Sequence, residues 1–220
     1  MTEQMTDQAT QRTAGEPGGQ PASSGHSVLD AETEDFAQQI ADQVESFLLA
    51  LNAIATEADG GRAISLLLLE VSQVLLAGAR LGAVQDFTPE QEYQPDVGPD
   101  PDLDAMRLRL ADTLGNLDTY SFVFDPYVPE VVDSQLSDDF TSIATDLENG
   151  MRHYRAGRVI EALWWWQFSY VSSWGNLAGA ALNALLSVVS HDRLDVDVDL
   201  DSDRVAAANE MLAEDSEPPR

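Results

Sequence analysis

The sequence predicts an all-α protein that folds as a single five-helix bundle, mostly antiparallel, with a long tryptophan-rich central helix toward the C-terminus. Apolar residues recur at intervals of three and four along most of the chain, which is the period of an amphipathic helix. Residues 162–190 carry no charge, although the 220-residue chain has a formal net charge of −28. All four tryptophans lie in this uncharged segment, so the segment must be buried.

Two helices are predicted in the first third of the chain. The first covers residues 32–57 and ends at Asp59-Gly60-Gly61, because glycine commonly terminates helices. The second runs from Arg62 to Leu81, and Gly82 closes it. Its run Leu66–Leu69 is apolar on every side, which is typical of a helix that neighbours cover.

The third and fourth helices have recognisable start signals. Asp100 suits the N-cap of the third helix, Pro101 its first position, and Asp102 the positive end of the helix dipole. Ser137 suits the N-cap of the fourth helix. The inner face of the fourth helix is formed by residues at helical spacing: Phe140, Ile143, Leu147, Met151 and Tyr154.

The connection between these helices, residues 119–129, is rich in aromatic side chains. It contains Tyr120, Phe122, Phe124 and Tyr127. Leaving such rings in water would forgo about 1.5–3 kcal/mol each. We therefore expect this connection to pack across one end of the bundle.

The uncharged segment is long enough to cross a bilayer, but its polar residues favour a core helix. Small or polar residues recur at four and three through Gly175 without a break: Ser169, Ser173, Asn176, Ala180, Asn183, Ser187 and Ser190. The opposite side carries larger or apolar residues: Trp164, Phe168, Val171, Ala178, Leu182, Leu185 and Val189. We therefore predict one amphipathic helix at the centre of a soluble bundle and no membrane span.

The chain divides into three parts by composition. Residues 1–30 are polar and predict a disordered leader, residues 31–192 the bundle, and residues 193–220 an acidic tail with a short helix at 203–213. The N-terminus has no signal-peptide pattern, so we expect a cytoplasmic protein. The strong negative charge argues against direct binding to nucleic-acid phosphates, and it is compatible with a protein partner. The oligomeric state stays open.

Recognisable catalytic chemistry is absent from the sequence. It contains no glycine-rich nucleotide loop, no HExxH motif and no cysteine, and its three histidines are scattered. We therefore predict no catalytic residue, no cofactor and no metal. Arg152, Arg155 and Arg158 are expected to complement the C-terminal end of the fourth helix, and the alternative is an anion site.

The three adjacent tryptophans are the best candidates for a contact site. Neighbouring residues on a helix point about 100° apart, so Trp164, Trp165 and Trp166 cannot all face the core. We expect Trp165 to be the outward ring. Glu161 either pairs with an arginine or lies partly buried beside the indoles. The candidate interaction or pocket residues are Trp165, Trp164, Trp174, Glu161, Tyr154 and Asp139.

An ordered set of motifs resembles the domain-of-unknown-function family 5063, in its actinobacterial form. The motifs are Phe124-Asp125-Pro126-Tyr127, Leu136-Ser137-Asp138-Asp139, Asp146-Leu147, Tyr154 followed by Gly157, Glu161–Trp166, Phe168-Ser169-Tyr170 and Trp174-Gly175. The resemblance covers about residues 35–190 and implies a helical fold without an established activity. In the family a histidine commonly precedes the Trp-Gly pair, where this chain has Ser173.

Three functions are compatible with these observations. The favoured one is a non-catalytic interaction or regulatory module that binds a partner protein through an exposed indole face or the acidic surface. The first alternative is a small-molecule binder or hydrolytic enzyme with a pocket formed by Glu161, Trp164, Tyr154 and Asp139. The second is an acidic mimic of nucleic acid that binds a DNA-handling protein.

Overall fold

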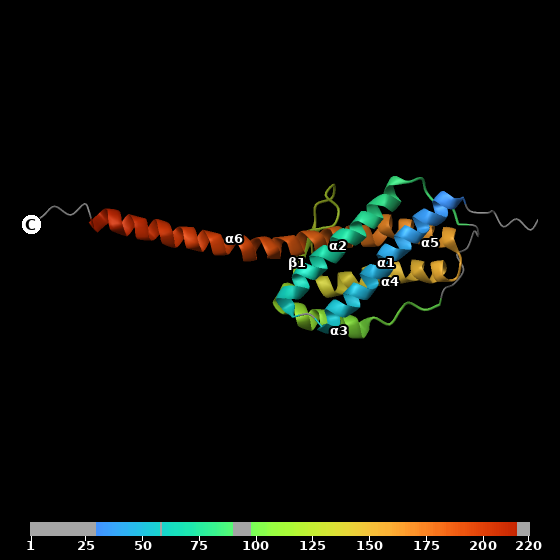
Figure 1. Ribbon diagram of the computed structural model, residues 1–220, viewed down its shortest axis with the longest axis horizontal. Helices are drawn as coiled ribbons and strands as arrows, with labels where there is room; N and C mark the ends of the chain where they lie inside the picture. The colour runs from blue at the N-terminus through green and yellow to red at the C-terminus, as the bar shows by residue number, and fades with distance from the viewer. Residues whose placement is uncertain (1–29, 58, 90–97, 215–220) are drawn as a thin grey trace, which may run out of the picture.

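The computed structural model describes residues 30–57, 59–89 and 98–214, of which 195–214 are described by their backbone alone (Figure 1). The elements in chain order are α1 (Ala31–Glu57), α2 (Gly60–Ala83), α3 (Asp104–Leu114), the 3₁₀ turn η1 (Gly115–Leu117), β1 (Thr119–Val123), β2 (Val131–Gln135), α4 (Leu136–Arg155), α5 (Val159–Ser169), the π turn η2 (Tyr170–Trp174) and α6 (Gly175–Glu214). Because η2 joins α5 and α6 into one long helix, the described chain forms the five predicted helices and adds a small hairpin.

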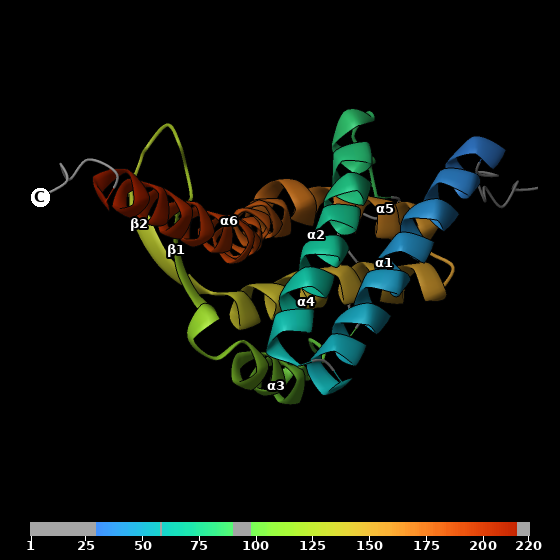
Figure 2. The ribbon, with the colours of Figure 1, turned by 60° about the vertical axis from the view of Figure 1, so that its left-hand side comes forward.

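Two layers of helices enclose the core. Figure 2 shows α1 and α2 crossing in front of α4 and α5, with α3 at one end of the bundle. The largest completely buried side chains come from both layers: Phe47, Leu51 and Leu67 from the first, and Phe140, Leu147, Trp166 and Trp174 from the second. The apolar helix faces that the sequence predicts therefore meet between the two layers and form the core.

Capping residues define the start of α1 and α2. The Asp30 carboxylate accepts a hydrogen bond from the Thr33 backbone N–H at 2.7 Å, and the Asp59 carboxylate accepts one from the Arg62 N–H at 3.0 Å. Both bonds satisfy backbone donors that have no partner inside the helix. The glycines after Asp59 thus begin α2, whereas the sequence predicted them as the end of α1.

The predicted caps of the third and fourth helices are wrong. α3 begins at Asp104 rather than after Asp100, and the Asp100 carboxylate instead accepts a hydrogen bond from the Asn149 side chain at 3.0 Å. Ser137 lies inside α4, where its N–H and hydroxyl donate to the buried Asp118 carboxylate at 2.8 and 2.9 Å. In both places an aspartate bonds to α4 across the fold, which local sequence does not reveal.

The aromatic connection forms a β-hairpin rather than a cover over the bundle. β1 pairs antiparallel with β2, with Thr119 opposite Gln135 and Val123 opposite Val131. Of its four aromatic rings, Tyr120 and Phe122 are partly buried, whereas Phe124 and Tyr127 are exposed. We expected the whole connection to pack across the bundle, and this expectation is wrong for the turn that holds Phe124 and Tyr127.

The π turn changes the phase of the tryptophan-rich helix. A π turn holds one more residue than an α turn, so it rotates the following faces by about 100° relative to the preceding ones. After the turn, Asn176 and Asn183 are exposed and Leu185 is buried, as predicted. Before it, Ser169 is buried and Phe168 is exposed, opposite to the prediction. The polar stripe is therefore broken at η2.

Gly175 permits the π turn to end where it does. A Cβ at this position would lie 2.4 Å from the Tyr170 carbonyl oxygen. This oxygen belongs to the backbone, so it cannot move away as a flexible side chain could. From Gly175, α6 continues without interruption to Glu214 and extends beyond the bundle (Figure 1). The separate short helix predicted at 203–213 is thus part of one 40-residue helix.

One described helix, α2, is long and apolar enough to cross a bilayer by length and composition, a test that core helices of soluble proteins also pass. It buries Ile64, Leu67, Val71 and Val74 within the bundle.

Candidate functional site on the tryptophan-rich helix

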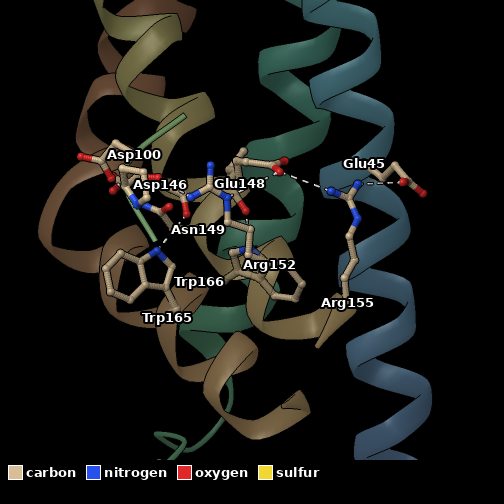
Figure 3. A network of polar contacts seen from close by, with 11 residues as sticks. Glu45, Asp100, Asp146, Glu148, Asn149, Arg152, Arg155, Trp165 and Trp166 are labelled. Carbon is tan, nitrogen blue, oxygen red and sulfur yellow. Dashed lines mark hydrogen bonds and ion pairs between the residues drawn. The ribbon is translucent and has the colours of Figure 1, made fainter. Parts of the chain in front are cut away.

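Two of the three adjacent indoles fix α5 against α4. The Trp166 Nε1–H donates to the Leu147 carbonyl oxygen at 3.0 Å, and the Trp165 Nε1–H donates to the Asp146 carbonyl oxygen at 2.9 Å (Figure 3). Trp166 is completely buried and Trp165 partly buried. A buried indole N–H without an acceptor is costly, so both bonds set the register of the two helices.

Gly150 makes this close approach possible. A Cβ on Gly150 would lie 2.1 Å from the Trp166 Nε1, in the space that the indole occupies. The Tyr154 ring covers Trp166 with a ring-centroid distance of 6.1 Å. The tryptophan side chains of α5 therefore contact the backbone of α4 as well as its side chains.

Trp174 is a core residue rather than a contact residue. It is completely buried, and its ring lies 4.8 Å from the Tyr170 ring at the π turn. A Cβ on Gly78 of α2 would meet both rings, so α2 packs directly on this pair. The Trp174 Nε1–H has no hydrogen-bond partner within the described part of the chain.

Trp164 and Trp165 are both partly buried, and Trp164 begins an aromatic strip on α5 and η2 that reaches the surface at Phe168 and Val171. We define it as Trp164, Phe168 and Val171, which share one helix face at spacings of four and three. The Trp164 and Phe168 rings stack at 5.2 Å with an interplanar angle of 7°, and Trp164 also meets Trp165 edge-on at 6.1 Å. Phe168 is 54% exposed and Val171 68% exposed. The sequence reading missed these two residues because it extended one stripe through the π turn.

Glu161 lies in a buried polar cluster at the turn between α4 and α5. Glu161 and His153 are both buried, and the Arg158 Nε–H donates to the His153 Nδ1 at 3.3 Å. Burial lowers the pKa of His153, the Arg158 charge lowers it further, and Glu161 partly opposes both. Since Nδ1 accepts a hydrogen bond, the ring is neutral and carries its proton on Nε2.

The three arginines at the end of α4 bind groups of the protein itself. Arg155 pairs with Glu45 of α1 at 3.1 Å and with Glu148 at 3.3 Å (Figure 3). Arg152 donates to the Pro99 carbonyl oxygen, and Arg158 donates to His153. These contacts tie α1 and the segment before α3 to α4, and they leave no geometric support for the anion site.

The structure does not assemble the predicted pocket. Asp139 lies in the first turn of α4, where it accepts hydrogen bonds from the Tyr120 hydroxyl at 2.6 Å and the Ser134 hydroxyl at 2.9 Å. Tyr154 lies fifteen residues later, about 22 Å along the same helix, and donates to Gln38 of α1 at 2.7 Å. Tyr154, Glu161 and Trp164 belong to the α4–α5 end, whereas Asp139 anchors the hairpin.

Burial shifts the pKa values of Asp139 and Tyr120, which join the hairpin to α4. It raises the pKa of the Asp139 carboxyl, an effect that the hydrogen bonds from Tyr120 and Ser134 partly offset. Burial also raises the pKa of the Tyr120 phenol, and the hydrogen bond to Asp139 raises it further. The phenol therefore stays protonated and keeps donating to Asp139 at neutral pH.

Two of the hollows on the described surface lie away from these residues. One of about 360 Å³ lies between α1, α3 and α4, and its lining includes Leu51, Met106 and Arg109. The other, of about 440 Å³, lies at the start of α1 and is lined by acids together with Phe36 and Phe87. Among the described residues, no three His, Asp or Glu side chains are grouped so that they could hold a metal ion.

These features define a helical-bundle protein with a partly buried tryptophan stacked on an exposed phenylalanine at the surface of α5. The family model described as a domain of unknown function (DUF5063) matches residues 31–191, and the chain belongs to this family.

The fold resembles that of a solved structure. The crystal structure of protein BF1032 from Bacteroides fragilis matches with a TM-score of 0.58 at 15% sequence identity, over 70% of this chain and 92% of that one. At this identity the likeness concerns the fold alone. The search of curated proteins found no match.

Proposed function

We propose that the protein is a non-catalytic interaction module that binds a partner protein through the aromatic strip, as a cytoplasmic protein of the actinobacterial form of its family. The observation that carries this proposal is the exposure of Phe168, which stacks on the Trp164 ring, together with the exposure of Val171 on the same helix face. Aromatic residues stacked on a rigid helix are typical anchors of protein interfaces, because they bury a large apolar area with little loss of side-chain freedom.

The strip is held in a fixed geometry before any partner binds. Trp165, which Trp164 contacts edge-on, is tied to α4 by its N–H, and the Ser169 hydroxyl donates to the Trp165 carbonyl oxygen at 2.6 Å. A preformed surface loses less conformational entropy on binding than a flexible one. This geometry supports recognition of a partner rather than a purely structural role.

The alternatives have less support. The enzyme alternative depended on a pocket that contains Asp139 and Tyr154 together, and these residues lie at opposite ends of α4. The nucleic-acid mimic depends on the net charge of −28 and stays a prediction. It differs from the interaction module in one measurable way, since its partner binding would weaken steeply with salt and would survive loss of the strip.

Affinity capture with matched variants tests the proposal. The wild-type protein, Phe168→Ser and Leu186→Ser serve as baits in extracts of the native cell, with Leu186 as the control because it is an exposed apolar residue of α6 outside the strip. We expect a partner that the wild type and Leu186→Ser retain and Phe168→Ser loses. Identical partner sets for all three baits would refute the proposal.

A further inference from the structure

The turn of the β-hairpin is a second apolar surface, separate from the aromatic strip. We call residues 124–131 the hairpin tip. Phe124 is 50% exposed, Tyr127 94%, Val128 67% and Val131 71%. Figures 1 and 2 both show this turn projecting from the body of the bundle. Single exposed apolar residues are ordinary, but a contiguous projecting group of them marks an interaction site.

Hydrogen bonds hold the strands and the turn of the hairpin. Tyr120 of β1 and Ser134 of β2 both donate to Asp139, so one buried carboxylate on α4 holds both strands. In the turn, the Asp125 side chain accepts from the Tyr127 N–H at 2.9 Å, and the Asp125 carbonyl oxygen accepts from the Val128 N–H at 3.0 Å. The exposed side chains are therefore presented in a defined arrangement before binding.

The charges around the tip select the kind of partner. Asp125, Glu130 and Asp133 are exposed beside the apolar residues. No Lys, Arg or His occurs between residues 110 and 151. A complementary surface must therefore offer an apolar centre with positive charges around it, and an arginine of such a surface can also stack on the Tyr127 ring.

We propose that the hairpin tip docks into an apolar pocket of a basic protein, with Tyr127 and Val128 inserted and Arg or Lys side chains of the partner facing Asp125, Glu130 and Asp133. The other occupants of an apolar surface fit these charges poorly. A second copy of the chain, an anionic membrane and a nucleic acid would each bring negative charge against the acidic rim. This proposal does not depend on the aromatic strip.

Site-specific photocrosslinking identifies the occupant directly. A benzophenone side chain replaces Tyr127 in the full-length protein, and the control replaces Leu186 with the same group; irradiation in the native cell is followed by mass spectrometry of the crosslinked segment. We expect position 127 to crosslink to a segment with apolar residues flanked by Lys or Arg, and position 186 not to. A crosslink to a second copy, to lipid or to nucleic acid, or none at all, would overturn the proposal.

A titration with the crosslinked partner, prepared as a folded protein, measures the contribution of the tip. Tyr127→Ser keeps the charge of the surface, so we expect about tenfold weaker binding, whereas Leu186→Ser should change the affinity less than about twofold. Raising the salt concentration should weaken wild-type binding as well. Equal affinities of wild type and Tyr127→Ser would show that the acidic surface alone binds the partner and would refute docking of the tip.

Discussion

Single residues determine how closely the tryptophan-rich helix approaches α4, and Gly150 is the clearest case. Its missing side chain leaves the space that the Trp166 indole fills, and that indole reaches the Leu147 carbonyl only at this distance. A glycine inside a helix otherwise lowers stability by about 1 kcal/mol relative to alanine. The position therefore keeps an unfavourable residue because packing requires it.

Replacing Gly150 with alanine should destabilise the protein, although a glycine-to-alanine change inside a helix usually stabilises it. We expect Gly150→Ala to lower the free energy of unfolding by about 1–3 kcal/mol through overpacking against Trp166, measured by urea denaturation. The control is Gly179→Ala in α6, where an added Cβ meets no atom within 4 Å and the stability should stay equal or rise. Equal effects of both substitutions would contradict the close contact.

His153 should give the protein a defined pH dependence. Its pKa in the folded state lies below the usual 6.5, so between these two pKa values the unfolded chain binds more protons than the folded protein. The contribution of His153 to stability is complete above pH 6.5 and is lost as the pH falls from 6.5 through the folded-state pKa. The slope cannot exceed about 1.4 kcal/mol per pH unit for one group.

The measurement compares the wild type with His153→Asn by urea unfolding at pH 7.5 and pH 5.5. Titration of the acidic groups is common to both proteins, including Asp139 and Asp146, whose raised pKa values act in the opposite direction. We expect the wild type to lose more stability than the variant over this interval. Parallel losses would show that His153 is not held neutral by its surroundings.

At the scale of elements, the π turn decides which side chains become surface. Phe168 and Val171 belong to the same apolar face as Leu185 when one uninterrupted α-helix is assumed, and the extra residue in η2 separates them. The helical period of α1, α2 and α4 was readable from the sequence because these helices are uninterrupted. No local pattern indicates the π turn, so the exposed face of α5 could not be predicted.

Deletion of one residue from the turn tests this phase shift. Removing Ser172 should convert η2 into an ordinary α turn and force either α5 or α6 out of register with the core, at a cost of more than about 3 kcal/mol. Ser172→Ala is the matched control, because Ser172 is exposed and its hydroxyl only donates to the Phe168 carbonyl. Similar melting temperatures for the deletion and the control would refute an essential π turn.

Across the whole molecule, the sequence predicts which helix faces are buried between the layers. It does not predict which residues from distant segments contact one another. The buried faces of α1 and α4 follow from their own periodicity. The bonds from Asp100 to Asn149 and from Asp118 to Ser137 join residues 49 and 19 positions apart, and they replaced the caps that local patterns indicated. For the same reason the four-residue pocket was not predictable, because residues of one helix can lie more than 20 Å apart.

The distribution of aromatic residues over the molecule links the fold to its proposed role. Trp165, Trp166 and Trp174 hold the helices together, whereas Trp164 and Phe168 form a surface that intramolecular packing leaves partly uncovered. Calorimetric titration with the captured partner tests most directly whether the strip binds a partner while the other tryptophans hold the fold. The proteins compared are the wild type, the double variant Phe168→Ser/Val171→Ser and the control Leu186→Ser. A binding role for the strip predicts at least about tenfold weaker binding for the double variant alone, with unchanged melting temperature. Equal affinities for all three proteins would contradict it.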